Sequence, residues 1–213
     1  MIFQTSNFGK SWEPISGDLS TNDKSKYGPA GGPIFNEATT AKNNGTVINL
    51  SESPVKAGVI WAGTDDGNVQ VTMNGGGSWT NVAPRLGVPQ DSVISHGEAS
   101  GVTTEATFVT VDRHMFDDFK PYIFKTTDGG KSFTNISGNL PEKAYVQVVK
   151  EDPKNPRLLY AGTELGLFVS LALRRNVKEC GELLKNDRAR VQPDFGMAWV
   201  QGVPAQSGRC GYG

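Results

Sequence analysis

One polar motif occurs three times in this sequence, and its repetition restricts the possible folds more than any other feature. The spacing is Thr-x-Asn/Asp-x-Gly-x-Ser-Trp/Phe, and the copies begin at Thr5, Thr72 and Thr126. Each copy stands between two stretches of alternating apolar and polar residues, the pattern of two strands joined by a tight corner. We therefore predict three hairpin turns, and we call residues 5–12, 72–79 and 126–133 the first, second and third box turns.

The residue types of the box turns suit a corner. An Asn or Asp side chain accepts backbone N–H groups of its own turn, Gly supplies a positive φ, and the Trp or Phe gives an apolar anchor. A P-loop is excluded because "GGKSF" leads into a strand and not a helix, and an EF-hand because flanking helices are missing. The residues predicted to have this structural role are Asn7, Gly9, Trp12, Asn74, Gly76, Trp79, Asp128, Gly130 and Phe133.

A second repeated phrase gives the size of the repeating unit. "VIWAGTDDGNVQVT" at 59–72 matches "LLYAGTELGLFVS" at 158–170, and each follows another strand pattern. Four strands in roughly 45 residues is the size of a propeller blade. We expect two strands in 1–16, complete blades in 45–83 and 91–137, and three strands in 144–171. The predicted class is all-β: a β-propeller segment of two complete four-stranded blades and partial blades, with a non-propeller C-terminal tail.

The order of the strands predicts which loops share a face. Successive turns of an antiparallel sheet alternate between its two ends, so the insertion at 17–44 and the loop "DRHMFDDF" at 112–119 belong to the face opposite the box turns. We call this the insertion face. Binding residues of such scaffolds concentrate in the longer loops. The predicted ligand contacts are therefore Asp66, Arg113, His114, Asp117 and Asp118.

Longer phrases carry a resemblance to a known family. With the box turns, "PISGDLSTND", "GGPIFNEATT" and "KEDPKNPRLLYAGTELGLFVS" make residues 1–171 resemble bacterial sortilin-type, neuraminidase-repeat (Asp-box) propellers, often labelled glycosyl hydrolase. More distantly, the blades resemble xyloglucanase-type and photosystem assembly-factor propellers. The resemblance implies a fragment of a larger, secreted propeller that works outside the cytoplasm. The N-terminal residues themselves lack a basic segment followed by an apolar run, so no signal peptide is visible.

The repeat pattern ends after Leu171. Another box turn is expected there, but the sequence continues without one, becomes net basic and contains both cysteines, Cys180 and Cys210. We predict a partial propeller in 1–171 and a divergent basic tail in 172–213 that is disordered or results from a frame shift.

Two carboxylates are candidates for catalysis. "AGTDDG" resembles the phrase that bears a catalytic aspartate in xyloglucanases; Asp65 is the matching position, and Glu164 holds it in the later repeat. Glycoside hydrolysis needs two carboxyl groups about 5–5.5 Å or about 6.5–9.5 Å apart. Asp or Glu before Gly is also an ordinary turn residue, and these two lie two blades apart. We expect Asp66 to be a surface turn residue, so that truncating Trp79 destabilises the fold more than truncating Asp66.

Charge and composition limit the partners. Lys and Arg number 21 against 22 Asp and Glu, so no strong field recruits nucleic acid or an anionic membrane. No run approaches the about 18 apolar residues of a membrane span. We expect no cofactor and no metal site, because His96 has no second His or Cys nearby.

These observations favour a binding scaffold. The expected partners are the remaining blades of a larger propeller and a carbohydrate or protein ligand. The alternatives are a glycoside hydrolase whose other catalytic blades lie elsewhere, and an assembly factor that grips another protein.

Overall fold

The computed structural model describes residues 1–26, 45–172 and 197–201. Within these residues the chain forms antiparallel sheets and short 3-10 turns, without α-helix. The first sheet is a hairpin of β1 (Phe3–Gln4) and β2 (Glu13–Pro14). The second contains β3 (Val47–Glu52), β4 (Ile60–Thr64), β5 (Val69–Thr72) and β6 (Thr80–Asn81). The third contains β7 (Val93–Ala99), β8 (Thr107–Arg113), β9 (Asp118–Thr126) and β10 (Thr134–Asn135). The fourth contains β11 (Val146–Glu151), β12 (Leu158–Thr163), β13 (Gly166–Ala172) and β14 (Met197–Gln201).

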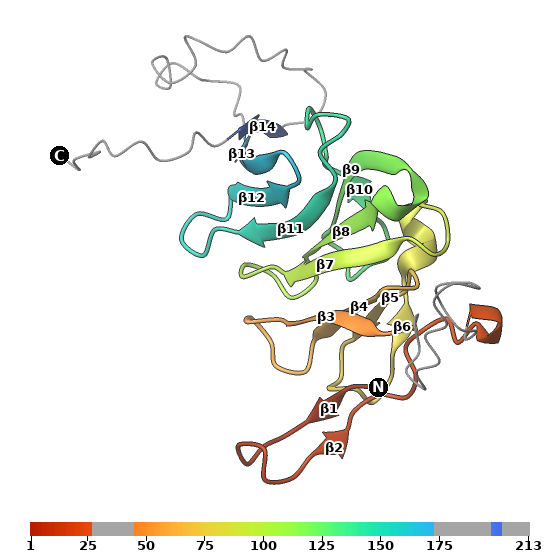
Figure 1. The fold of residues 1–213 in the computed structure, drawn as a ribbon. Helices are drawn as coiled ribbons and strands as arrows, with labels where there is room; N and C mark the ends of the chain where they lie inside the picture. Colours follow the sequence, from red (N-terminus) through yellow and green to blue (C-terminus); the bar gives the residue numbers. More distant parts are fainter. Residues whose placement is uncertain (27–44, 173–196, 202–213) are drawn as a thin grey trace.

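The sheets follow one another in chain order, from the red hairpin to the blue strands (Figure 1). Inside each four-stranded sheet the strands also follow chain order, so every neighbouring pair is an antiparallel hairpin. The first strands of consecutive sheets lie against each other, β3 against β7 and β7 against β11. This is the blade arrangement of a β-propeller, and the predicted fold class is confirmed, with both complete blades at the expected places.

Apolar layers between the sheets hold the blades together. Trp61, Val71, Val109 and Phe124 belong to the layer between the second and third sheets. Phe108, Ile123, Leu159, Phe168 and others fill the next one. Because the third sheet is covered on both sides, β8 is buried along its length up to Asp112. Burial on both faces explains why its sequence is continuously apolar or small and does not alternate.

Two features differ from the sequence prediction. The loop after β8 is shorter than expected, because residues 114–116 form the 3-10 turn η3 (His114–Phe116) and β9 begins at Asp118. The fourth sheet gains β14, which pairs with β13 from Ala172↔Met197 to Phe168↔Gln201. A strand pairs through its backbone and needs no box motif, so the end of the repeat pattern did not predict β14. The other predictions for the tail and for 27–44 lie outside the described residues.

Candidate binding site on the insertion face

The three box turns have the same hydrogen bonds. In the second turn Gly76 N donates to Thr72 Oγ1 (3.0 Å) and Ser78 N donates to Asn74 Oδ1 (2.9 Å). The first and third turns repeat both bonds at the equivalent positions. Gly9, Gly76 and Gly130 have positive φ angles. The Asn and Asp side chains of the motif, and the backbone of its Gly, therefore serve the turn itself.

The aromatic residues of the box turns differ in burial. Trp79 packs with the cluster around Ile2 and Ala62, and its Nε1 donates to Ile15 O of the first hairpin. Phe133 packs partly against the layer between the second and third sheets. Trp12 is 59% exposed, because among the described residues no further sheet covers that side of the first hairpin. The aromatic residue thus anchors a box turn where a preceding sheet is present.

The insertion after β2 lies over the opposite ends of the strands. The side chains of Asn68 and Gln70 donate to Leu19 O, and Lys26 pairs with Asp91 before β7. Asp117 and Asp128 lie at opposite ends of β9. For the described part, 17–26, the insertion is therefore on the face opposite the box turns, as the strand count predicted.

Asp66 is a correction to the sequence prediction, because it is not a surface residue. Its side chain is 1% exposed. Oδ2 accepts hydrogen bonds from both N and Oγ1 of Thr21, and Oδ1 accepts one from the Thr64 hydroxyl. The sequence did not predict the burial of Asp66, because its hydrogen-bond partner Thr21 is far away in the sequence.

Asp65 and Glu164 occupy equivalent turns in sheets that are separated by the third sheet. Asp65 N donates to Thr46 O, and Glu164 N donates to Tyr145 O. The Asp65 carboxylate accepts the N–H groups of Gly45 and Thr46, each at 2.7 Å. Glu164 is exposed and accepts the Tyr145 hydroxyl at 3.0 Å. The two catalytic candidates therefore belong to different local networks.

His114 is held by a buried carboxylate at the end of β8. Its Nδ1 lies 2.7 and 2.8 Å from the two oxygens of Asp112, whose side chain is 8% exposed. Asp112 also accepts His114 N and Gln147 Nε2, both at 2.9 Å. A carboxylate only accepts, so Nδ1 carries the proton of this contact, and Nε2 of the neutral ring is the acceptor.

A stacked pair of rings joins His114 to the fourth sheet. The rings of His114 and Tyr145 are 4.7 Å apart and nearly parallel, and Phe119 stands tilted against Tyr145 at 6.3 Å. The hydrogen bond to Glu164 raises the pKa of the Tyr145 phenol. The structure thus brings Glu164 and His114 into one cluster through Tyr145. The sequence did not predict Tyr145 as a site residue. Its place before β11 nevertheless matches the place of Thr46 before β3.

Arg113 and Asp118 close the base of the loop. Arg113 donates to Ser92 Oγ (2.6 Å) and to Asp118 Oδ2 (3.3 Å). Burial by itself raises the pKa of Asp118, but hydrogen bonds from Tyr122, from Lys120 N and from Arg113 bring it below the ordinary value. Burial and the same Asp118 contact raise the pKa of Tyr122. Asp118, whose side chain is 27% exposed, is therefore an anion that accepts hydrogen bonds from neighbouring residues of the protein.

The tip of the loop presents apolar side chains to solvent. Met115 is 79% exposed, Phe116 52% and Phe119 41%. The guanidinium of Arg113 lies 5.1 Å above the Phe116 ring, a cation–π contact. Asp117 is exposed and has a left-handed backbone, φ 57°. We call Met115, Phe116 and Phe119 the apolar tip.

The described residues contain no group of three His, Cys, Asp or Glu side chains that could hold a metal ion. His96, on the first strand of the third sheet, has its Nε2 3.5 Å from Glu98. Burial by itself raises the pKa of Glu98, and contacts with His96 and Lys150 outweigh it and lower the pKa. Among the same residues there is no helix long and apolar enough to cross a membrane.

Comparisons with known proteins identify the fold. No protein-family model and no curated protein matches the sequence. The GH74 xyloglucanase from Xanthomonas campestris matches 90% of this chain with a TM-score of 0.52 and 13% identity. An ancestral GH74 enzyme matches 59% of this chain with a TM-score of 0.47 and 19% identity. YCF48 from Cyanidioschyzon merolae matches 58% of it with a TM-score of 0.42 and 20% identity.

The chain spans 24% of the length of the xyloglucanase, 17% of the ancestral enzyme and 33% of YCF48. The match to the xyloglucanase covers 90% of this chain. It shows that the chain has the fold of a β-propeller segment.

Proposed function

We propose that this chain is part of a larger propeller that binds another protein through its insertion face. The observation that carries this proposal is the apolar tip, which stands exposed above a cluster of internally bonded polar residues. Phe, Met and Arg are enriched at the centres of protein interfaces. Met side chains also adapt to different partner surfaces. A protein surface is therefore a better match for this loop than a strongly polar sugar.

Internal hydrogen bonds hold the two residues that precede the apolar tip, Arg113 and His114. His114 is bonded to Asp112 on one side of η3, and Arg113 joins Ser92 and Asp118 on the other. A surface that is ordered in advance loses less conformational entropy on association. The polar residues predicted as ligand contacts, Arg113, His114 and Asp118, support the tip in this proposal, and the tip makes the contact.

A photo-crosslinking experiment tests the proposal. Phe116 is replaced by the photoreactive amino acid benzoylphenylalanine in the full chain, which is then irradiated in an extract of the source cells. Phe8, 103% exposed in the first box turn on the opposite face, is replaced in the same way as the matched control. We expect a discrete protein adduct from position 116 that is absent from position 8 and weaker after Phe119→Ser. Identical adducts from both positions, or none from position 116, contradict the proposal.

Glycoside hydrolysis is the alternative, and exposed Glu164 is the observation that favours it. Asp65, Asp66 and Asp112 are occupied by internal hydrogen bonds, so a second carboxylate would come from other blades. The test is release of reducing ends from xyloglucan by the chain and by its Glu164→Gln variant. We expect no release above background. Release that Glu164→Gln abolishes supports the hydrolase instead.

We also infer that the protein works outside the cytoplasm, as a member of the Asp-box, sortilin-type propellers. The support is the sequence resemblance together with three box turns of equal geometry. Fractionation of the source cells with an antibody against this chain tests it, and a purely cytoplasmic signal contradicts it.

A further inference from the structure

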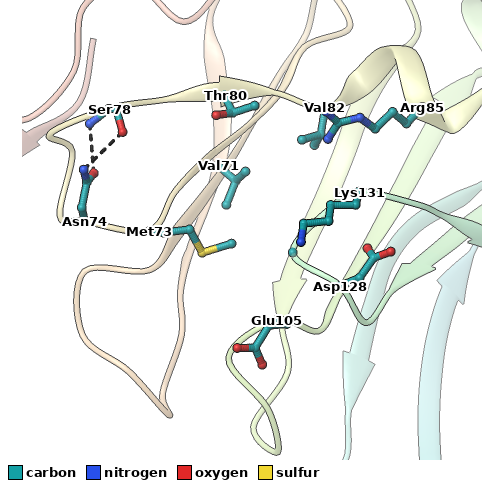
Figure 2. A pocket seen from close by; sticks show the side chains of 11 residues that line it. Val71, Met73, Asn74, Ser78, Thr80, Val82, Arg85, Glu105, Asp128 and Lys131 are labelled. Carbon is teal, nitrogen blue, oxygen red and sulfur yellow. Dashed lines mark hydrogen bonds between the residues drawn. The ribbon is translucent and has the colours of Figure 1, made fainter.

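A groove lies on the box-turn face, between the second and third box turns (Figure 2). Its volume is about 460 Å³, within the usual range of small-ligand sites. Val71, Met73 and Val82 from the second sheet give it an apolar side. Figure 2 shows Met73 and Lys131 pointing toward each other across it from the two neighbouring turns. This groove is far from the apolar tip, at the other end of the strands.

The groove carries one unengaged charge of each sign. Lys131 and Glu105 both line it, and within the described residues neither side chain has a hydrogen bond or an ion pair. Asp128 also lines it, but Thr126 and Ser132 already occupy that carboxylate. Arg85 donates one N–H to Gly130 O (2.6 Å), and its remaining N–H groups add positive charge at the same rim. A ligand that has both charges fits this arrangement.

The repeat provides an internal comparison for these residues. Gly129 N donates to Glu105 O, and in the preceding sheet Gly75 N donates to Gly58 O, so Gly58 holds the position of Glu105. By the spacing of the motif, Gly77 holds the position of Lys131. The second turn forms the same hydrogen bonds without either charge. The turn therefore does not require Glu105 or Lys131, and its stability does not explain their presence.

We propose that this groove binds a short peptide with free termini and an apolar side chain. The peptide ammonium group pairs with Glu105, the carboxylate pairs with Lys131 beside Arg85, and the apolar side chain covers Met73 and Val71. Two or three residues suit the volume better than a single amino acid. Because both charged residues are exposed, the affinity falls as salt is added.

Equilibrium dialysis of the full chain against the labelled tripeptide Ala-Leu-Ala tests the proposal. This experiment measures the peptide retained by the protein, and it does not depend on the oligomeric state of the chain. The same peptide with an acetylated N-terminus, and with an amidated C-terminus, removes one charge at a time. We expect each block to weaken binding by about tenfold. No retention of the free peptide, or equal retention of all three forms, overturns the proposal.

Variants assign each charge to its partner. Glu105→Gln should bind the free and the acetylated peptide equally, and Lys131→Gln the free and the amidated peptide equally. Lys10→Gln, at the same position of the first box turn but outside the groove, is the matched control and should bind as the unaltered chain does. Equal losses in all three variants, or none in the first two, contradict the proposed site. Unchanged melting temperatures show that the fold is intact.

Discussion

Two adjacent aspartates show how the same residue type acquires different roles. Asp65 accepts the N–H groups of Gly45 and Thr46 at the start of β3, whereas Asp66 turns inward and holds Thr21 of the insertion. Both follow the same Ala-Gly-Thr phrase, and their sequence context alone does not distinguish them. Asp66 therefore attaches the insertion after β2 to the second sheet.

We predict that Asp66→Ala destabilises the fold by about 2–3 kcal/mol, because hydrogen bonds to a charged group are lost and their donors stay unpaired. This loss approaches that expected for Trp79→Ala, in contrast to the expectation from sequence. Urea unfolding measures both, with Glu142→Ala, an exposed acidic residue, as the control. A loss for Asp66→Ala no larger than for Glu142→Ala would show that the buried contact does not stabilise the fold.

The third box turn should make part of the stability depend on pH. Hydrogen bonds from the Ser132 hydroxyl, the Ser132 N–H and the Thr126 hydroxyl hold the pKa of Asp128 well below 3.8. Since the folded pKa is the lower one, this stabilisation is present above 3.8 and is lost as the pH falls through 3.8 toward the folded pKa. The other turns have Asn7 and Asn74, which do not titrate.

Asp128→Asn should therefore flatten the fall in melting temperature between about pH 5 and about pH 2, and Asn74→Asp should steepen it. The two variants are reciprocal controls, because each converts one turn into the chemistry of the other. Parallel pH curves for both variants and the unaltered chain would mean that the turn carboxylate is not linked to folding.

At the scale of elements, a box turn also docks its hairpin onto the preceding sheet. Gly75 and Gly76 both have positive φ, 67° and 94°. A Cβ on Gly75 meets nothing within 4 Å, whereas one on Gly76 would lie 2.2 Å from the backbone oxygen of Ile15. The second Gly is therefore needed for the close approach of two sheets as well as for the turn.

Gly75→Ala should lower the free energy of unfolding by about 1–2 kcal/mol, because a residue with a Cβ is strained in the left-handed conformation. Gly76→Ala should lower the free energy of unfolding by clearly more, because its Cβ would also clash with the backbone oxygen of Ile15. Urea midpoints of the two variants make the comparison, and equal values would contradict the docking of the second box turn on Ile15.

The elements also show which parts of the fold could be predicted from the sequence. Alternation and the box motif predicted the strands of the second and third sheets, because these depend on local patterns. They did not predict β14, which depends on pairing with β13 across a long stretch of chain. They also did not join Tyr145 to His114 or Asp66 to Thr21, because each contact needs the packing of two sheets. Where a residue lies in a blade could be predicted, but its neighbour in the next blade could not.

At the scale of the whole molecule, several apolar surfaces are exposed in the part of the chain that the structure describes. The first sheet has only two strands among the described residues, and Phe3 (49%) and Trp12 (59%) are exposed on it. Ile48 (46%) and Leu50 (53%) are exposed on β3, the first strand of its sheet. An unpaired strand edge and exposed apolar side chains favour association with other chains or blades. Phe3→Lys, which places a charge on β1, should reduce this association.

Size-exclusion chromatography with light scattering tests the central claim, that this chain is an open segment of a propeller, most directly. The purified chain at micromolar concentration should give a mass above that of one chain, increasing with concentration, because uncovered blade surfaces associate. A sharp peak at the mass of a single chain, with one cooperative melting transition, would contradict the account and show that the chain covers its own blade surfaces.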